Sequence, residues 1–395
     1  MGIDRRRVLG VIGGLGAAGL VSACGGGGTA VPTTHQAHAR IGLLVPGTGG
    51  YKQIGDDTLN GFNLYLRGTG NRLGGYPVAT ELANEGDSVE TAMAALEDLL
   101  SRGVHAVIGV ANSAAMMPVS ERIEEVHVPL LGTASSPAAL QGTPHVWRTS
   151  YVNDEPGRAL GRHLAQAVDG PVAIVAQDDP AGVDAVLGLR ESFGEAGVTD
   201  LLLEEILTEA VSQPDPGHFD AALRTVRRAQ PRAVFACYVG DAAVAFLQRY
   251  VALGLDPRIL YAPAHLTEGA VLAAVGEAAL GVRTSANYAP ELRNPTNRGF
   301  ATAYRRDFGV QPTIYAVAAY DAAAAVDKAL ALSDGDLDPQ NVNANLARVG
   351  LIDSPRGRWQ FNQGRTPTQK WYLREVDYDG PQLSNLVLRE LGTLG

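Results

Sequence analysis

The sequence predicts an α/β protein made of two doubly wound parallel-sheet lobes joined by three hinge crossings. Short apolar runs alternate with helical patterns along almost the whole chain, as in parallel strands that helices cover on both faces. Three polar breaks, each carrying a proline, interrupt this alternation near residues 148–156, 286–290 and 352–357. Several crossings between two lobes would leave a cleft in which hinge closure can enclose a ligand.

The expected strands are continuous apolar runs without polar alternation, because strands of a covered parallel sheet are buried on both faces. They are Ile41–Val45, Val104–Val110, Val128–Leu131, Val172–Ala176, Ala233–Cys237 and Ile259–Ala262. The expected helices lie at about 57–67, 88–102, 115–126, 155–168, 182–196, 218–229, 241–253 and 313–332. With the breaks as boundaries, residues 40–152 plus 287–352 form lobe 1, and residues 153–286 plus 353–395 form lobe 2.

The first residues have the pattern of an export signal. Arg5 and Arg6 precede an apolar stretch that ends in small residues before Cys24. This pattern resembles a twin-arginine signal joined to a bacterial lipoprotein box. The resemblance implies removal of residues 1–23 and a diacylglyceryl group on Cys24, whose two acyl chains anchor the protein to the outer face of the cell membrane. Residues 24–39, rich in Gly, Thr, Pro and Ala, are then a lipidated flexible tether.

Composition and motifs exclude several classes of function. The net charge of −10 and pI near 5.3 argue against a nucleic-acid partner, and no apolar run is long enough for a polytopic membrane protein. Gly14–Gly19 fits G-x-G-x-x-G, but the glycines that follow Cys24 cannot continue the helix that a dinucleotide site needs. The sequence has no P-loop, G-x-S-x-G elbow or metal-ligand spacing. We therefore expect no cofactor, no metal and no enzymatic activity.

Two strand ends carry the side chains most suited to bind a ligand. One strand runs into Ala111-Asn112-Ser113, and the next runs into Thr133-Ala134-Ser135-Ser136. Hydroxyl groups and backbone N–H donors at the start of a helix suit a carboxylate or another compact oxygen-rich group. The alternative is that Ser113 and Ser136 merely cap their helices, which is the commonest use of such residues.

The mature chain resembles the type I periplasmic binding proteins of ABC transporters, and within them the branched-chain amino acid (Leu/Ile/Val) class. The residues that carry the resemblance are Ile41–Pro46, Asn60-Gly61, Ala106–Gly109, Val128–Leu131, Trp147–Thr149 and Ala319–Ala322. The resemblance implies a monomer that closes two lobes around a small molecule and delivers it to an ABC permease. A ligand sensor of the same fold, presenting its state to a membrane receptor, is the alternative function.

The resemblance also implies a set of ligand-binding positions. The first carboxylate-binding serine of the family falls on Ser113, with Ala111 and Asn112 beside it. The second hydroxyl falls on Ser136, with the backbone of Ala134 and Ser135 adjacent. Its aromatic positions fall near Ile54, with Tyr51 as a substitute, on Tyr315, and on Tyr238 or Val239.

Two family positions differ in this sequence. The glutamate that accepts the ligand ammonium aligns with Ala264 or His265, and the usual Tyr-Gly pair is Ala181-Gly182. Asp241 could replace the glutamate, or it could simply cap its helix. The sequence therefore predicts a ligand that is amino-acid-like or a carboxylate, bound in a site whose amine-binding half is altered.

Overall fold

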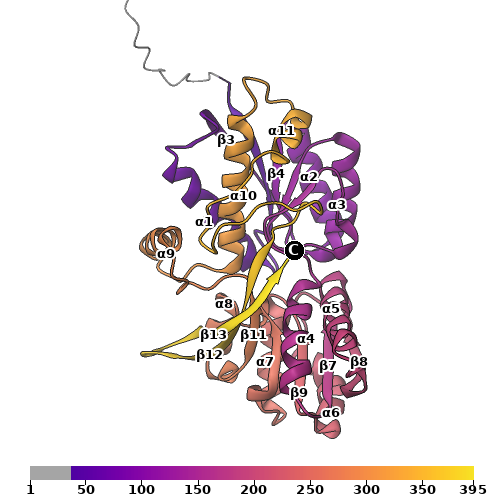
Figure 1. Ribbon diagram of the computed structural model, residues 1–395. Helices are drawn as coiled ribbons and strands as arrows, with labels where there is room; N and C mark the ends of the chain where they lie inside the picture. Colours follow the sequence, from indigo (N-terminus) through magenta and orange to yellow (C-terminus); the bar gives the residue numbers. More distant parts are fainter. Residues whose placement is uncertain (1–36) are drawn as a thin grey trace, which may run out of the picture. The chain divides into compact units, whose positions relative to one another are not determined.

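The structure, a computed structural model, describes residues 37–395, which form two α/β lobes (Figure 1). Within these residues one sheet has six strands in the order β2-β3-β1-β4-β5-β6, and the other has seven in the order β13-β12-β11-β10-β9-β7-β8. The strands are mostly parallel and lie between helices, so the predicted fold class is confirmed. The predicted export signal, Cys24 and the tether up to residue 36 lie outside the described residues.

Lobe 1 holds the six-stranded sheet with a separate core on each face. One core packs α1 and α10 against the strands, and the other packs α2 and α3. The strands are β1 (Ala39–Val45), β2 (Arg72–Leu73), β3 (Tyr76–Asn84), β4 (Ala106–Gly109), β5 (Leu130–Gly132) and β6 (Val146–Arg148). The helices are α1 (Lys52–Gly68), α2 (Val89–Ser101), α3 (Ser113–Val126), α9 (Pro295–Phe308), α10 (Ile314–Ala331) and α11 (Pro339–Leu346), with the short η1 (Ala138–Leu140).

Lobe 2 is built in the same way around the seven-stranded sheet. One face is covered by α6, α7 and α8, and the other by α4 and α5. The strands are β7 (Val172–Gln177), β8 (Leu202–Thr208), β9 (Ala233–Cys237), β10 (Leu260–Pro263), β11 (Arg283–Ala286), β12 (Gln369–Asp379) and β13 (Gln382–Leu394). The α-helices are α4 (Glu155–Ala167), α5 (Pro180–Ala196), α6 (Asp220–Ala229), α7 (Asp241–Ala252) and α8 (Ala270–Val275). The short 3₁₀ helices are η2 (Thr199–Leu201), η3 (Pro216–Phe219), η4 (Pro257–Ile259), η5 (Ala264–Thr267) and η6 (Gly276–Ala279).

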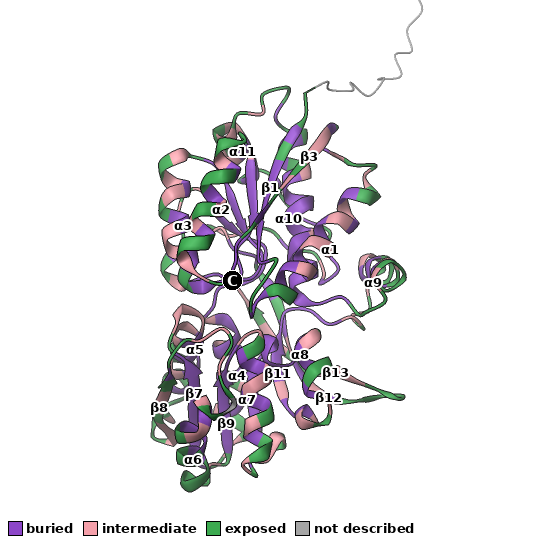
Figure 2. Ribbon diagram, turned by 180° about the vertical axis from the view of Figure 1, so that it is seen from behind, coloured by how far each residue is buried: buried purple, intermediate pink, exposed green. Residues whose placement is uncertain are grey.

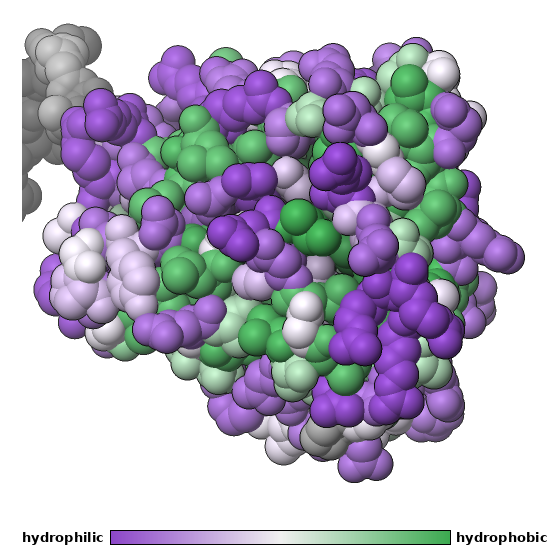
Figure 3. Space-filling view, turned by 90° about the horizontal axis from the view of Figure 1, so that it is seen from below, coloured by the Kyte–Doolittle hydropathy of each residue, from purple (hydrophilic) through white to green (hydrophobic). Residues whose placement is uncertain are grey.

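Burial explains which strands the sequence predicted. The central strands β1, β4, β7 and β9 are buried almost throughout, so their residues form continuous apolar runs (Figure 2). The sequence missed β3 and β8, which are only partly buried and contain polar residues that interrupt the apolar run. It also missed the antiparallel hairpin β12–β13, which makes the second sheet mixed rather than parallel. Apolar and hydrophilic side chains are interspersed on the face in Figure 3.

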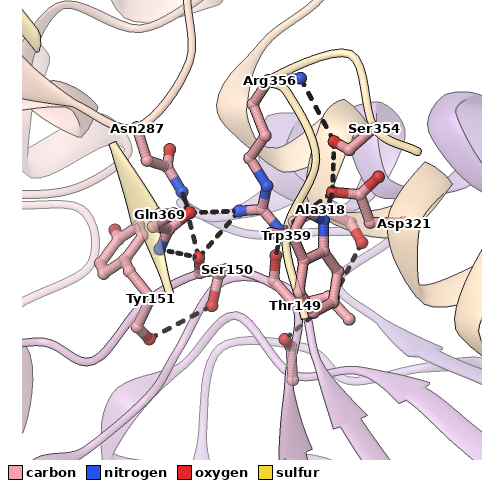
Figure 4. Close-up of polar contacts among 11 residues, drawn as sticks. Thr149, Ser150, Tyr151, Asn287, Ala318, Asp321, Ser354, Arg356, Trp359 and Gln369 are labelled. Atoms are coloured by element: carbon pink, nitrogen blue, oxygen red, sulfur yellow. Dashed lines mark hydrogen bonds and ion pairs between the residues drawn. The ribbon is translucent and has the colours of Figure 1, made fainter. Parts of the chain in front are cut away.

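The three connections between the lobes meet at one buried guanidinium (Figure 4). The Ser150 carbonyl of the first crossing accepts hydrogen bonds from Asn287 Nδ2 of the second (3.0 Å), and from Arg356 Nη1 (3.0 Å) and Gln369 Nε2 (2.8 Å) of the third. Arg356 also donates to the Thr149 carbonyl at 2.5 Å and to Gln369 Oε1 at 2.7 Å. We call this group the hinge cluster.

An ion pair completes the hinge cluster. Arg356 Nη2 lies 2.9 Å from Asp321 Oδ2 of α10, and both side chains are buried. The same carboxylate oxygen accepts hydrogen bonds from Ser354 Oγ at 2.8 Å and Trp359 Nε1 at 2.9 Å. The Arg356 guanidinium also lies 5.0 Å from the centre of the Trp359 ring. The hinge cluster therefore ties the three crossings to a helix of lobe 1.

The third crossing lies later in the chain than the sequence placed it. Trp359 belongs to the lobe 1 core, with Phe361 packed against it, and Phe361 pairs with Pro367 in an isolated bridge. Residues 353–367 therefore pack on lobe 1 instead of lobe 2, and the chain joins the second sheet at Gln369. Within residues 37–395, no helix combines the length and the apolar character that a membrane span requires.

Candidate functional site

A cavity lies between the lobes at the carboxyl ends of the strands. In a parallel α/β sheet this edge is where ligands bind. The cavity contains about 350 Å³ of empty space, part of it open to solvent. Its lining includes residues from both lobes and from the first crossing: Ile54, Ala111, Ser113, Ala134, Ser135, Tyr151, Asn153, Ala181, Val239, His265 and Tyr315. Asp, Glu, Lys and Arg do not occur among these lining residues.

The start of α3 is arranged by a carboxylate that sequence reasoning missed. Asn112 is the N-cap, and its Oδ1 accepts a hydrogen bond from the Ala114 N–H at 2.9 Å. Buried Glu85 accepts the N–H groups of Ala111 and Asn112 at 2.8–3.0 Å. Burial raises the pKa of Glu85 to about 7. These two N–H groups, which the sequence left available to a ligand, are therefore occupied, and the Asn112 side chain serves as a cap outside the cavity lining.

Ser113 and Ser135 place their hydroxyl groups side by side at the cavity, whereas Ser136, on which the resemblance placed the second ligand-binding hydroxyl, is not among the lining residues. Ser135 Oγ donates to Ser113 Oγ at 3.1 Å, and both residues are buried. Ser113 is the first helical residue and not the cap, so its hydroxyl is not used for capping. Ser136 is fully buried, and its N–H donates to Asn153 Oδ1 at 3.1 Å. In the described chain, Ser136 Oγ is a buried atom without a hydrogen-bond partner.

His265 forms part of a polar row on the lobe 2 side of the cavity. Its Nδ1 lies 3.4 Å from Tyr151 Oη, and its Nε2 lies 3.4 Å from Cys237 Sγ. Burial lowers the pKa of His265 to about 4, so its ring is neutral at pH 7. Burial also raises the pKa values of Tyr151 and of the Cys237 thiol. This side of the cavity is therefore uncharged.

The predicted aromatic positions fall into two groups. Ile54 and Tyr315 line the cavity from the first turns of α1 and α10, and Tyr51 is packed beside them in the same buried cluster. Burial raises the pKa of Tyr51 to about 12. Tyr238 lies instead in the lobe 2 core.

Its own neighbours hold Tyr238 away from the cavity. The ring stacks on Phe246 with 4.4 Å between ring centres, and its hydroxyl lies 3.0 Å from Thr208 Oγ1. Val239, the alternative position, lines the cavity. The structure therefore places Val239, and not Tyr238, at the candidate site.

Asp241 does not replace the family glutamate. Its carboxylate is exposed and accepts a hydrogen bond from Gln213 Nε2 at 3.1 Å. Its backbone N–H instead donates across the lobes to the Gly50 carbonyl at 3.1 Å. A Cβ atom on Gly240 would lie 2.3 Å from the same oxygen. The two lobes therefore meet closely at this edge of the cleft.

Two further hydrogen bonds connect the lobes around the cavity. Ala138 N–H donates to Asp184 Oδ2 at 2.8 Å, and Ile314 N–H donates to Glu268 Oε1 at 2.9 Å. Arg374 Nη2 holds the other oxygen of Glu268 at 2.7 Å, and this ion pair is buried. The negative charge of Glu268 is therefore committed to a structural contact and is not offered to a ligand.

Tyr151 and Asn153 are the lining residues that the sequence reasoning missed. Both lie in the polar break at residues 148–156 that marked the first crossing. Because this crossing borders the cleft, the break itself was the signal that could have found them. A larger recess, lined by His38, Arg40 and His105 among others, lies at the opposite end of β1. Within residues 37–395, His, Cys, Asp and Glu side chains do not gather as a metal-ligand set.

Comparison with known proteins decides the family. Residues 38–381 match the pattern of the periplasmic binding proteins. The chain belongs to this family. A Leu/Ile/Val-binding protein homologue from Brucella suis is 26% identical over 348 residues, covering 85% of this chain and 87% of the relative. This periplasmic binding protein is thus a solute-binding protein and not an enzyme.

Solved structures agree with this assignment. A solute-binding protein of an ABC transporter from R. palustris, in complex with benzoate, is 26% identical with a TM-score of 0.82, covering 91% of this chain and 98% of that one. A leucine-binding protein from Thermotoga maritima has a TM-score of 0.79 at 19% identity, covering 89% and 99%, and shows the shared fold. Small-molecule capture for an ABC permease fits both the fold and the cavity.

Proposed function

We propose that this protein captures a small carboxylate without an amino group between its lobes and delivers it to an ABC permease. It does so as an extracytoplasmic lipoprotein held by Cys24. The observation that carries the proposal is the uncharged lining of the cavity. Hydroxyl groups and a helix N-terminus gather on the lobe 1 side, and neutral groups occupy the side where the family places an ammonium-binding glutamate.

The lobe 1 side suits a carboxylate. Ser113 Oγ accepts the hydrogen bond of Ser135, so its own proton is left to donate into the cavity. Asn153 Nδ2 is a second buried donor beside the cavity, and its side chain also interacts with the nearby Asp184 carboxylate. The N-terminus of α3 also lies on this side, but Glu85 and Asn112 already accept N–H groups there, so the hydroxyl and amide donors carry the contact. These groups stabilise a carboxylate without a cationic side chain.

An ammonium group would be poorly bound on the other side. His265 is neutral, and Glu268 is paired with Arg374. A buried ammonium without a carboxylate partner loses at least about 1–3 kcal/mol of hydrogen bonding, which corresponds to roughly 5- to 150-fold in affinity. The benzoate bound by the R. palustris relative is a carboxylate of the proposed kind.

Calorimetric titration with benzoate, 4-methylpentanoate and leucine tests the proposal. The last two compounds share a branched chain and differ by the amino group. We expect at least one amine-free acid to bind about tenfold more tightly than leucine. Leucine binding as tightly as the best acid, or binding by none of these carboxylates, would overturn the proposed ligand class.

A pair of serine variants then tests the placement of the carboxylate. Ser113→Ala should weaken binding by about 10- to 100-fold, because it removes a hydrogen bond to a charged group. Ser120→Ala is the matched control, since Ser120 is buried in the same helix and bonds only to the Met117 carbonyl. Equal affinities of the two variants would refute this placement.

A further inference from the structure

Three side chains and one backbone carbonyl form a continuous row of hydrogen-bonding groups beside the cavity. Tyr151 Oη lies 3.4 Å from His265 Nδ1, and His265 Nε2 lies 3.4 Å from Cys237 Sγ. Cys237 Sγ in turn donates to the carbonyl oxygen of Ala181 at 3.7 Å. The row joins the first crossing, η5, the end of β9 and the first turn of α5. Its side chains are all buried.

The number of protons determines the direction of the row. In their neutral forms a phenol, an imidazole and a thiol each carry one exchangeable proton. The Ala181 carbonyl at the end of the row can only accept a hydrogen bond, so the thiol proton of Cys237 points toward it and away from His265. The Cys237 sulfur then accepts from His265 Nε2–H, and His265 Nδ1 accepts the phenol proton of Tyr151. In this arrangement every proton of the row has an acceptor.

The opposite direction satisfies fewer groups. The thiol proton would turn from the carbonyl to His265 Nε2, and His265 Nδ1–H would donate to Tyr151 Oη. The phenol proton would then have no acceptor within the row. A buried donor without a partner is costly, whereas an oxygen that keeps an unused lone pair costs less. The first direction is therefore the more stable one.

We propose that this row makes Tyr151 a hydrogen-bond acceptor toward the ligand, so that the protein selects carboxylates that also carry a hydroxyl or neutral N–H donor. Tyr151 and His265 both line the cavity, so the phenol oxygen is within reach of a bound molecule. This inference rests on the proposed function and names the second recognition element of the same site. A hydroxy acid would donate to Tyr151 Oη, whereas its methyl ether would bring an acceptor against that oxygen.

The test compares hydroxy acids with their methyl ethers on the aromatic or branched carboxylate framework that binds. On a ring, the probes are 3- and 4-hydroxybenzoate and the matching methoxybenzoates. On a branched chain, they are 2-hydroxy-4-methylpentanoate and its 2-methoxy derivative. We expect a hydroxy acid to bind about 10- to 100-fold more tightly than its ether, as for a site that loses a buried hydrogen bond. Equal affinities would overturn the inference and leave the proposed carboxylate function intact.

Two variants test whether the preference for hydroxy acids over their methyl ethers depends on Tyr151. Tyr151→Phe should bring the two affinities within about twofold, because the accepting oxygen is gone. Tyr250→Phe removes a buried phenol whose partner is the Asp256 carbonyl in the lobe 2 core, and should keep the preference. Retained preference in Tyr151→Phe would refute the role of this oxygen.

The tautomer of His265 gives an independent readout that folding defects do not mimic. Nitrogen-15 NMR of the ligand-free protein should show His265 protonated at Nε2, and Cys237→Ser should keep that tautomer because serine can also donate to the Ala181 carbonyl. A proton on Nδ1 would reverse the row and overturn the proposal.

Discussion

Removal of the Arg356 guanidinium is the most direct test of the hinge cluster. Arg356→Met keeps a long apolar side chain in the same buried space but removes the charge and its donors. Asp321 would lose its cationic partner at 2.9 Å and keep only the hydrogen bonds from Ser354 and Trp359. The carbonyl groups of Thr149 and Ser150 would lose the donors that Arg356 supplies.

The expected loss of stability follows from burial. Asp321 is fully buried, and burial raises its pKa to about 6 even with Arg356 beside it. Breaking a buried ion pair by removal of one partner costs about 3–5 kcal/mol, because the remaining charge is uncompensated. Domains are commonly stable by about 5–15 kcal/mol. The variant should therefore still fold but unfold at a clearly lower urea concentration.

Urea unfolding followed by circular dichroism measures this loss. Asp321→Asn in the Arg356→Met background should recover part of the stability, because it removes the uncompensated charge. Arg258→Met is the control, since its ion pair with Asp256 is exposed and screened by solvent and should contribute little to stability. A loss below about 1 kcal/mol in Arg356→Met, or a second substitution that destabilises further, would refute the reasoning.

Three other outcomes can be checked. Gly240→Ala should lower ligand affinity at least about tenfold, because its Cβ would lie 2.3 Å from the Gly50 carbonyl and its φ of +62° disfavours a side chain. Titration measures the affinity, and small-angle scattering with ligand would reveal incomplete closure of the lobes. An unchanged affinity would contradict this prediction. Cys24→Ala should release the protein from membranes, which fractionation of cells detects. Burial raises the pKa of Glu155 to about 8, above its unfolded value near 4.3, so its folded form binds the extra proton. Its contribution to stability is present at pH 4 and is lost as the pH rises through 8. In Glu155→Gln the urea concentration at the midpoint of unfolding should therefore change less between pH 4 and pH 8 than in the wild type.

The fold was predictable because the buried strands and their helices leave strong patterns. Central strands such as β7 are buried throughout and apolar up to their last residue, and the polar breaks fall at or near the crossings. Partly buried edge strands such as β8 leave no such run. The third crossing was misplaced because the polar residues at 353–358 are not a linker. Arg356 is polar in sequence but buried in the hinge cluster, where its partners come from distant parts of the chain.

The candidate site was predictable where the chain leaves a strand and enters a helix. It was less predictable where a shift of one residue decides whether a side chain points into the core or into the cavity. Ser113 lies at the cavity because the strand end and the helix start fix its position, whereas the second hydroxyl there belongs to Ser135 and not to Ser136. After β9, neighbouring residues point to opposite sides, so a shift of one position exchanges core and cavity. Tyr238 and Val239 were equivalent in sequence, and Phe246 and Thr208 decide between them by holding the tyrosine in the core. The polarity of the site likewise depends on contacts such as Tyr151 to His265, which join residues 114 positions apart. If the proposed row sets ligand choice, that choice depends on tertiary contacts around the strand-end site, and Cys237→Ala, which removes the acceptor of His265 Nε2–H, should weaken it, whereas Cys237→Ser should not.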